Sequence, residues 1–198
     1  MMTMIKNLIV VGMGGQGVKL LSTLLRRAIG ERYGRFAGFD ERGGAQRYGP
    51  VAAAIRFSDK ANYDGPLALD FKDGGAHWVI ALEASEPLRY NSKLGRDTVL
   101  ISDSVIVPPT NVRRDDEEYF TIEQLSQHYE ERCCRLFLRD FRKLASEKTG
   151  NPLDANLLAM GFLLGQMDGV LELSDFETLV TEKQFVVIQD GHALGEKS

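Results

Sequence analysis

Apolar runs and amphipathic segments alternate along the chain. Residues 5–11 form a run dominated by Ile, Leu and Val, which predicts a strand buried on both faces, as in parallel sheets. Four glycines follow between residues 12 and 17. From Val18 onward, leucines and alanines recur at helical spacing as far as Gly34, which suits a C-terminal helix cap. The chain therefore begins with a strand, a glycine turn and an amphipathic helix.

The following residues repeat this alternation of short strands and helices. Further strands are predicted at residues 35–39, 51–57, 77–82 and 98–102, and helices at 84–90 and 121–132. Residues 135–139 fit either a continuation of the last helix or a short strand. Buried strands that alternate with helices are typical of an open sheet. We therefore expect one α/β domain over residues 1–198, with a Rossmann-like, mostly parallel sheet and flanking helices.

Two segments are expected to stand apart from this core. Residues 107–133 contain a turn-rich, charged insertion, in which Arg113 and Arg114 precede four acidic residues. Residues 169–198 look peripheral, with a further helix start at 174–177. We assign no chemical function to either segment.

The most hydrophobic helix is predicted from Leu153 to Met167, with Asn151 as its cap and Pro152 at its first position. Its sequence leaves almost no polar face. A helix that is apolar all round must be buried all round. One side can cover the sheet. The other side would be covered by a partner or, equally, by tight packing inside the monomer. Gly161 and Gly165 share one face and permit close approach. Asn156 needs a fixed polar contact there, which we expect at the carboxyl edge of the sheet.

The glycine turn after the first strand has the geometry of an anion site. Backbone N–H groups at the start of a helix are unpaired, and the helix dipole favours negative charge there. Gly12, Gly14 and Gly17 also match the G-x-G-x-x-G dinucleotide pattern, and Asp40 stands where that pattern places a ribose-binding acid. The alternative is that the glycines only allow tight packing of the helix on the sheet.

A second charged and glycine-rich stretch follows the strand at 35–39. Gly43 and Gly44 stand between Arg42 and Arg47, which could form a second backbone surface for anions at the same edge of the sheet. A solvated connection is the competing interpretation. Glu83 ends another strand beside a helix start, where we expect it to serve as a cap.

Composition narrows the class of protein. The chain has 198 residues, of which 43% are hydrophobic and 26% charged, and a net charge of −4. These values are typical of a globular protein, and the scattered basic residues give no indication of nucleic-acid binding. The sequence shows no secretory signal and no apolar stretch of membrane-spanning length, so we expect a cytoplasmic protein without a membrane partner.

The only two cysteines, Cys133 and Cys134, are adjacent. Without a C-x-x-C pair they cannot supply a zinc or iron–sulfur site from this chain alone, so no metal ligand is assigned.

Taken together, several motifs resemble the gamma-type subunit of the 2-oxoacid:ferredoxin oxidoreductases, and especially the beta subunit of indolepyruvate ferredoxin oxidoreductases. The resemblance spans most of residues 5–168. The matching segments are Gly12-Met13-Gly14-Gly15-Gln16-Gly17-Val18, Glu41-Arg42-Gly43-Gly44, residues 51–58, Glu83-Ala84-Ser85-Glu86-Pro87-Leu88-Arg89, and residues 156–165.

The resemblance implies a subunit of a larger enzyme that oxidatively decarboxylates a 2-oxoacid to an acyl-CoA and passes electrons to ferredoxin. Indolepyruvate, another aryl pyruvate or pyruvate would be the substrate. Thiamine diphosphate and the iron–sulfur clusters would be carried by a larger partner subunit, and this chain would be inactive alone. The resemblance also implies a strand at 135–138 and a helix at about 140–148.

The resulting expectation is a chain without catalytic residues that assists assembly and contacts the coenzyme A or another anion. The candidate binding residues are Gly12, Gly14, Gly15, Gln16, Gly17, Arg42, Gly43 and Gly44. The larger subunit is the expected partner, and a second copy of the chain is an alternative one. A stand-alone Rossmann-type protein that binds NAD(P) or FAD is the competing function. A third possibility is a scaffold without a ligand site, whose sign would be a glycine loop filled by its own side chains.

Overall fold

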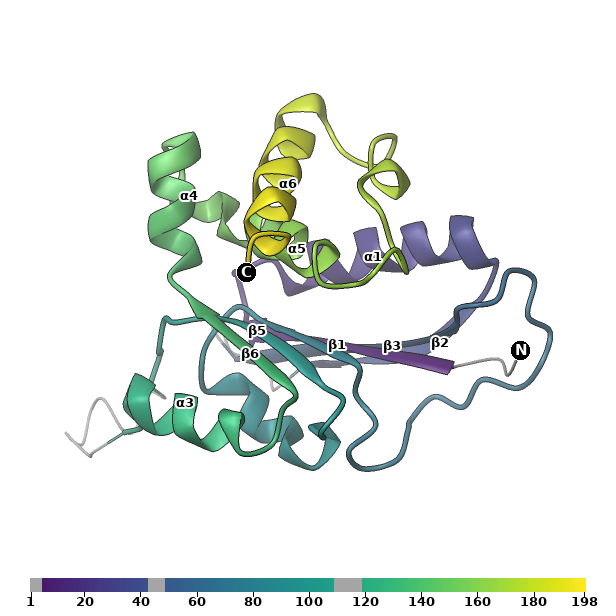
Figure 1. Cartoon of the computed structure of the whole chain (residues 1–198), viewed down its shortest axis with the longest axis horizontal. Helices are drawn as coiled ribbons and strands as arrows, with labels where there is room; N and C mark the ends of the chain where they lie inside the picture. The colour runs from purple at the N-terminus through teal and green to yellow at the C-terminus, as the bar shows by residue number, and fades with distance from the viewer. Residues whose placement is uncertain (1–4, 43–48, 109–118) are drawn as a thin grey trace.

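The structure is a computed structural model that describes residues 5–42, 49–108 and 119–198 (Figure 1). Helices lie on both faces of one sheet of six strands, whose spatial order is β2-β3-β1-β4-β5-β6. The strands are β1 (Ile5–Met13), β2 (Phe36–Arg42), β3 (Pro50–Ser58), β4 (Trp78–Ala81), β5 (Val99–Asp103) and β6 (Arg135–Arg139).

The helices fall into two layers. One layer contains α1 (Val18–Tyr33), α4 (Phe141–Thr149), α5 (Ala155–Leu164) and α6 (Glu182–Gly195). The opposite face carries the short 3-10 helix η1 (Glu86–Lys93) and α3 (Ile122–Glu130). Two further 3-10 turns, η2 (Pro152–Asp154) and η3 (Leu173–Asp175), precede α5 and α6. The expected Rossmann-like α/β fold with a mostly parallel sheet is confirmed.

Strand direction brings the predicted loops to one edge of the sheet. Among the described strands, β3 alone runs opposite to the other five: it pairs antiparallel with β1 and β2, whereas β1, β4, β5 and β6 pair in parallel. Because β3 is antiparallel to both β1 and β2, the last two point the same way. In the register, Gly12 faces Val51 and Val51 faces Arg42. The glycine turn and the end of β2 therefore lie at the same carboxyl edge, as the sequence predicted.

Each face of the sheet has its own hydrophobic core. Side chains alternate along β1, so Leu8 and Val10 face α1 and α5, whereas Ile9 and Val11 face η1 and α3. All four are at most 1% exposed. This double burial explains why β1 reads as a continuous apolar run rather than an alternating one.

The apolar helix α5 is buried inside this chain. On one side α5 faces the sheet, and on the other it packs against α6 (Figure 1). A Cβ atom on Gly161 would lie 2.1 Å from the carbonyl oxygen of Ile188, and one on Gly191 would lie 2.1 Å from that of Leu158. Glycines on both helices thus permit backbone contact. Internal packing, and not a partner surface, is the outcome for this face of α5.

The contact between α5 and α6 makes the C-terminal segment part of the core. Residues 169–198 were expected to be peripheral, but Val187 and Ile188 of α6 are at most 2% exposed in the main core. A long helix does not begin at residues 174–177, where only the single turn η3 forms. Instead α6 begins after Thr181, whose side chain forms a reciprocal capping box with Gln184.

The other elements follow the sequence pattern closely. Residues 135–139 are a strand and not a continuation of α3, as the resemblance implied. The side chain of Thr121 caps α3 in a box with Gln124, and Asn151 caps the turn that leads into α5. The helix α5 ends at Leu164, three residues earlier than predicted. The predicted insertion at 107–133 is described only outside residues 109–118.

The α5–α6 contact makes a prediction for stability. Gly161→Ala should lower the free energy of unfolding by about 1–3 kcal/mol, because its Cβ meets backbone that cannot move away locally. The measurement is urea denaturation of the whole chain. Gly30→Ala in α1 is the matched control, since its Cβ would meet nothing closer than a ring carbon of Phe36 at 3.7 Å. The control should gain about 0.5–1 kcal/mol from reduced backbone entropy. Equal stability of the two variants would contradict the packing.

Candidate functional site

The glycine turn joins β1 to α1 through two left-handed residues. Gly15 and Gly17 have φ angles of +94° and +97°, which residues with a side chain rarely adopt. The N–H of Gly14 donates to the carbonyl oxygen of Gly49 at 2.8 Å, which ties the turn to the start of β3. The turn therefore needs these glycines for its shape, independently of any ligand.

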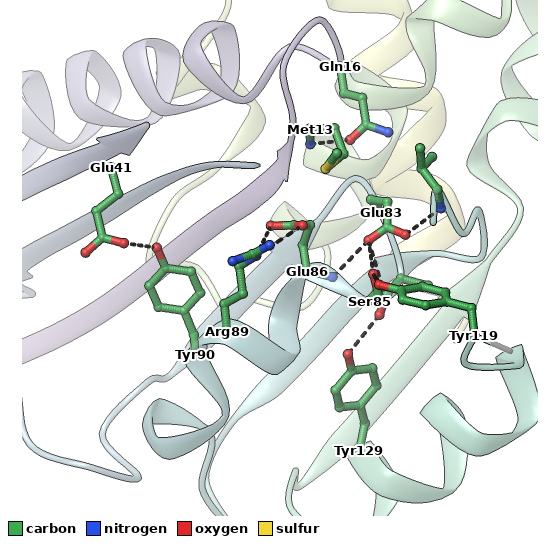
Figure 2. A network of polar contacts seen from close by, with 12 residues as sticks. Met13, Gln16, Glu41, Glu83, Ser85, Glu86, Arg89, Tyr90, Tyr119 and Tyr129 are labelled. Atoms are coloured by element: carbon green, nitrogen blue, oxygen red, sulfur yellow. Dashed lines mark hydrogen bonds and ion pairs between the residues drawn. The ribbon is translucent and has the colours of Figure 1, made fainter. Parts of the chain in front are cut away.

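The side chain of Gln16 folds back into the turn. Its Oε1 accepts a hydrogen bond of 2.7 Å from the N–H of Met13 (Figure 2). From the other side, Nδ2 of Asn156 donates to the carbonyl oxygen of Gln16 at 3.2 Å. A Cβ on Gly17 would lie only 2.0 Å from that Nδ2. The loop is thus partly filled by its own side chains, and the expected contact of Asn156 with the carboxyl edge is present.

Part of the loop nevertheless remains open to an anion. The first N–H in α1 to reach a helical acceptor is that of Leu21, which donates to Gly17, and no side chain caps the helix. Among the described residues, the N–H groups of residues 18–20 therefore have no protein partner. A Cβ on Gly15 would meet nothing within 4 Å. The free N–H groups and this open space are the features an anion would use.

The predicted second surface is only partly described. Arg42 is the last residue of β2 and stands at the same edge as Gly12. Its side chain, together with Gly43 and Gly44, falls outside the described residues. The contribution of these three residues to anion binding therefore stays a prediction.

Asp40 does not take the place of a ribose-binding acid. In a dinucleotide-binding unit, β1 lies directly beside the strand that carries this acid. Here β3 separates β1 from β2, so Asp40 is two strands away from the glycine turn. Its carboxylate pairs with Arg26 of α1 at 2.5 Å. The geometry therefore does not favour the competing NAD(P)- or FAD-binding function.

Glu83 is a buried cap at the end of β4. Its side chain is 0% exposed, and its Oε2 accepts hydrogen bonds from the N–H groups of Ser85 and Glu86 at 2.8 and 2.9 Å (Figure 2). The hydroxyl of Ser85 donates to the same oxygen at 2.8 Å. The other oxygen, Oε1, accepts from the N–H of Val107 at 2.8 Å. Glu83 thus caps η1, as expected from the sequence, and all its contacts are those of a structural residue.

Two tyrosines complete this network. The hydroxyl of Tyr119 donates to Oγ of Ser85 at 3.1 Å, and that of Tyr129 donates to the carbonyl oxygen of Ala84 at 2.8 Å (Figure 2). Val107 and Tyr119 lie on either side of residues 109–118. The turn after β4 therefore fixes the chain at both ends of that segment.

A pocket of about 470 Å³ lies beside this network, between η1, the end of β2 and the start of β3. The lining residues are Glu41, Pro50, Val51, Ala52, Glu86, Arg89 and Tyr90. Its charged and polar groups are paired with one another: Arg89 contacts Glu86 at 3.3 Å, and the hydroxyl of Tyr90 donates to Glu41 (Figure 2). Burial raises the pKa of Glu86, and burial together with the Glu41 carboxylate raises the pKa of Tyr90.

Asp103 is a buried carboxyl that the sequence analysis did not single out. It ends β5 and is 3% exposed, and its Oδ1 accepts a hydrogen bond from Val105 at 3.0 Å. Burial raises its pKa to about 6, although the bond from Val105 and the charge of Arg142 act in the opposite direction. Only its position at the end of an apolar strand could have indicated this residue.

The described residues hold no group of three or more His, Cys, Asp and Glu side chains that could bind a metal ion. Cys133 is buried, which raises the pKa of its thiol to about 11, and Cys134 is exposed. None of the helices in the described parts of the chain is long and apolar enough to cross a membrane.

The family model and the similar sequences both point to oxidoreductases of one kind. The family model for pyruvate ferredoxin/flavodoxin oxidoreductase matches residues 7–187. A protein named indolepyruvate oxidoreductase subunit IorB from Archaeoglobus fulgidus is 28% identical over 176 residues, which is 89% of this chain and 84% of that protein. The protein of the same name from Pyrococcus horikoshii is 29% identical over 158 residues, with 79% and 75% of the two chains covered.

Solved structures share the fold. The gamma subunit of a keto/oxoacid ferredoxin oxidoreductase from Geobacter sulfurreducens superposes with a TM-score of 0.64 at 18% identity, covering 98% of this chain and 99% of its own. Subunit PORC of a pyruvate oxidoreductase from Thermotoga maritima gives 0.61 at 17% identity, covering 98% and 96%. A 2-oxoglutarate:ferredoxin oxidoreductase from Magnetococcus marinus also gives 0.61 at 17% identity, with 98% of this chain matching 31% of that one.

The raised pKa of Asp103 makes a prediction about pH. In the folded chain, the pKa of about 6 lets this carboxyl hold its proton up to about pH 6, whereas an aspartate in the unfolded chain ionises near its ordinary pKa of about 3.9. Its contribution to stability is therefore fully present below pH 4 and is lost as the pH rises through 6. Asp103→Asn keeps the acceptor for Val105 and cannot ionise. It should match the wild type at pH 4 and exceed its free energy of unfolding by about 2–3 kcal/mol at pH 7.5. A constant difference between the two proteins in urea denaturation from pH 4 to 8 would contradict this assignment.

Proposed function

The chain belongs to the pyruvate ferredoxin/flavodoxin oxidoreductase family, and on that premise we propose that it is the gamma-type subunit of a thiamine diphosphate-dependent 2-oxoacid:ferredoxin oxidoreductase. Such an enzyme decarboxylates a 2-oxoacid oxidatively to an acyl-CoA and transfers the electrons to ferredoxin. The observation that carries the proposal is the extent of the family match, which reaches from residue 7 to 187 of 198. The similarity to a protein named as a subunit, over 84% of the length of the Archaeoglobus fulgidus protein, supports the subunit role.

The proposed substrate is an aryl pyruvate such as indolepyruvate. The support is the shared name of the curated relatives, indolepyruvate oxidoreductase subunit IorB. Pyruvate is the competing substrate, because the family model and the Thermotoga maritima subunit carry that name.

We assign this chain an assisting rather than a catalytic role. Thiamine diphosphate and iron–sulfur clusters would be held by the larger subunit. With only two cysteines, one of them buried, the chain offers too few thiolates for a cluster of four cysteine ligands. The carboxylate network around Glu83 is fully hydrogen-bonded within the chain, so it offers no free base for catalysis. The isolated chain should therefore have no oxidoreductase activity.

The glycine turn is the proposed contact with a phosphate of coenzyme A. No described residue pairs with the N–H groups of residues 18–20 at the positive end of α1, and the space at Gly15 is open. The side chain of Gln16 already accepts a hydrogen bond from the N–H of Met13, so the turn holds its shape without the ligand. A helix N-terminus at the surface contributes only about 0.3–1 kcal/mol toward an anion. The isolated chain should therefore bind coenzyme A weakly, and the assembled enzyme should supply the remaining contacts.

The subunit role is tested by purifying the tagged chain at native expression level from its own cells. We expect a stable complex with a larger chain that contains thiamine diphosphate and iron–sulfur clusters. The complex should reduce ferredoxin with indolepyruvate and coenzyme A, and each separated chain should not. A chain that purifies as a monomer, with no such partner at any salt concentration, would overturn the proposal.

The glycine turn is tested separately with Lys19→Glu in the assembled enzyme. Lys19 is an exposed residue in the first turn of α1. The positive end of the helix dipole stabilises a carboxylate there by about 0.3–1 kcal/mol, but the carboxylate repels a bound phosphate. The KM for coenzyme A should rise several-fold while the melting temperature stays the same or increases. Lys19→Gln, which only removes the charge, should lie between the wild type and the glutamate variant. An unchanged KM in both variants would show that the turn is structural.

A further inference from the structure

Positive charge is concentrated at one edge of the sheet. Residues 133–143 carry four cationic side chains and one acid, Asp140, in a chain whose net charge is −4. We call these four side chains the basic edge: Arg135, Arg139, Arg142 and Lys143. They belong to β6, which is the last strand of the sheet, and to the first turn of α4, which follows β6 directly (Figure 1).

The side chains of the basic edge contact neutral groups rather than carboxylates in the described part of the chain. No ion pair among the described residues joins any of its four side chains to an acid. Arg135 instead donates to Oε1 of Gln166 at 2.8 Å, and Arg139 donates to the carbonyl oxygen of Leu138 at 3.2 Å. Asp140 caps α4 by accepting the N–H of Lys143 at 2.9 Å. The buried Asp103 acts electrostatically on Arg142.

The placement of Arg142 and Lys143 is unfavourable for the helix that carries them. The first turn of α4 contains no acidic residue, and cations there oppose the positive end of the helix dipole. Each such charge costs about 0.3–1 kcal/mol at the surface. Arginines on an edge strand can protect it from pairing with a second copy, but this role does not explain Arg142 and Lys143, which lie beyond the strand. An anionic partner would stabilise the cations of both elements.

Within the described parts of the chain, no strand pairs with β6 on the side away from β5. Toward β5, the N–H of Arg135 donates to Thr98 and the carbonyl oxygen of Arg139 accepts from Ser104. Because neighbouring residues of a strand alternate in direction, the N–H and C=O groups of Leu136 and Leu138 point to the free edge. The carbonyl oxygen of Leu138 already accepts a hydrogen bond from the Arg139 side chain, which an added strand would replace. The two N–H groups and the carbonyl oxygen of Leu136 are arranged to pair with one more strand.

The side chains of the two arginines point to one face of the sheet. Arg135, Phe137 and Arg139 alternate with Leu136 and Leu138, and the ring of Phe137 packs on Phe162 of α5 at 5.2 Å between centroids. Arg135 and Arg139 thus stand on either side of Phe137, on the face that also carries α4.

We propose that an extended acidic segment of the larger subunit binds to β6 as a seventh strand, with carboxylates opposite Arg135 and Arg139. Side chains directly opposite each other in paired strands are about 4.5–5.5 Å apart, which suits ion pairs at both positions. Arg142 and Lys143 would contact acids beyond the end of the added strand. The outward N–H groups of Leu136 and Leu138 favour a polypeptide, which offers carbonyl oxygens to them, over a nucleic acid, whose phosphates would use only the cations. The inference rests on the proposed subunit role.

Two pairs of variants test the charges and the strand separately, in the full chain with the purified larger subunit as the probe. Arg139→Glu combined with Lys143→Glu reverses two charges of the basic edge. Its control, Arg27→Glu combined with Lys183→Glu, changes net charge equally at exposed positions of α1 and α6. Leu138→Pro removes one outward N–H, which an edge strand tolerates, and Leu138→Ala controls for the lost side chain.

Binding is measured by sedimentation velocity and by hydrogen exchange of residues 135–139 at low and high salt. The reversal in the basic edge should weaken binding about tenfold at low salt, and the difference should shrink at high salt. The proline variant should bind more weakly than the alanine variant. Residues 136 and 138 of the wild type should gain exchange protection in the complex.

Three results would overturn the inference while leaving the subunit role intact. The first is wild-type affinity in both the charge reversal and the proline variant. The second is loss of affinity in the charge reversal without exchange protection of β6, because the charges would then attract a partner without an added strand. The third is duplex DNA that binds more tightly than the subunit and loses affinity with the same reversal. Failure of the wild type itself to bind the subunit would instead overturn the proposed function on which the inference rests.

Discussion

Burial of β1 on both faces is the constraint on which the rest of the structure depends. Its side chains alternate between two cores, so helices must cover both sides of the sheet. The strand also pairs with β3 on one side and β4 on the other, which fixes the register of the central sheet. Its carboxyl end therefore determines where the glycine turn, the end of β2 and the Glu83 cap come together. The site described above is a consequence of this position.

The same demand for burial explains the C-terminal half. The helix α5 covers the sheet with one side, and its other side would leave a large apolar surface in contact with water. Glycines on α5 and α6 bring the two backbones into contact, so α6 removes this surface within the chain. A subunit of this kind thus has no need of a partner to bury its most hydrophobic helix. A contact with another subunit is therefore expected at charged parts of the surface, and above all at the edge strand β6.

The glycine turn shows why a motif and its chemistry must be separated. The G-x-G-x-x-G spacing occurs in full, yet β3 lies where the ribose-binding strand of a dinucleotide site would be. Gln16 and Asn156 take up part of the loop, while the free N–H groups of α1 remain. The turn therefore has a structural role in every case, and any ligand it binds must share the space with these two side chains. A weak, assembly-dependent contact with an anion agrees with this geometry better than a complete nucleotide site.

Local pattern determined most of the elements, because periodicity, caps and glycines act over a few residues. The strand–turn–helix at residues 5–33, the helix that begins after Thr121 and the one that follows Asn151 could all be predicted in this way. Strand direction and the partner of α5 could not, since both depend on residues more than twenty positions apart. The same applies to Asp40, whose spacing suggested a ribose contact until the insertion of β3 placed it beside Arg26. The raised pKa of Asp103 likewise comes from burial, which is a property of the folded chain alone. The sequence by itself thus determined the elements and the family, whereas the tertiary structure decided which faces are covered, because covering a face requires contacts between segments distant along the chain.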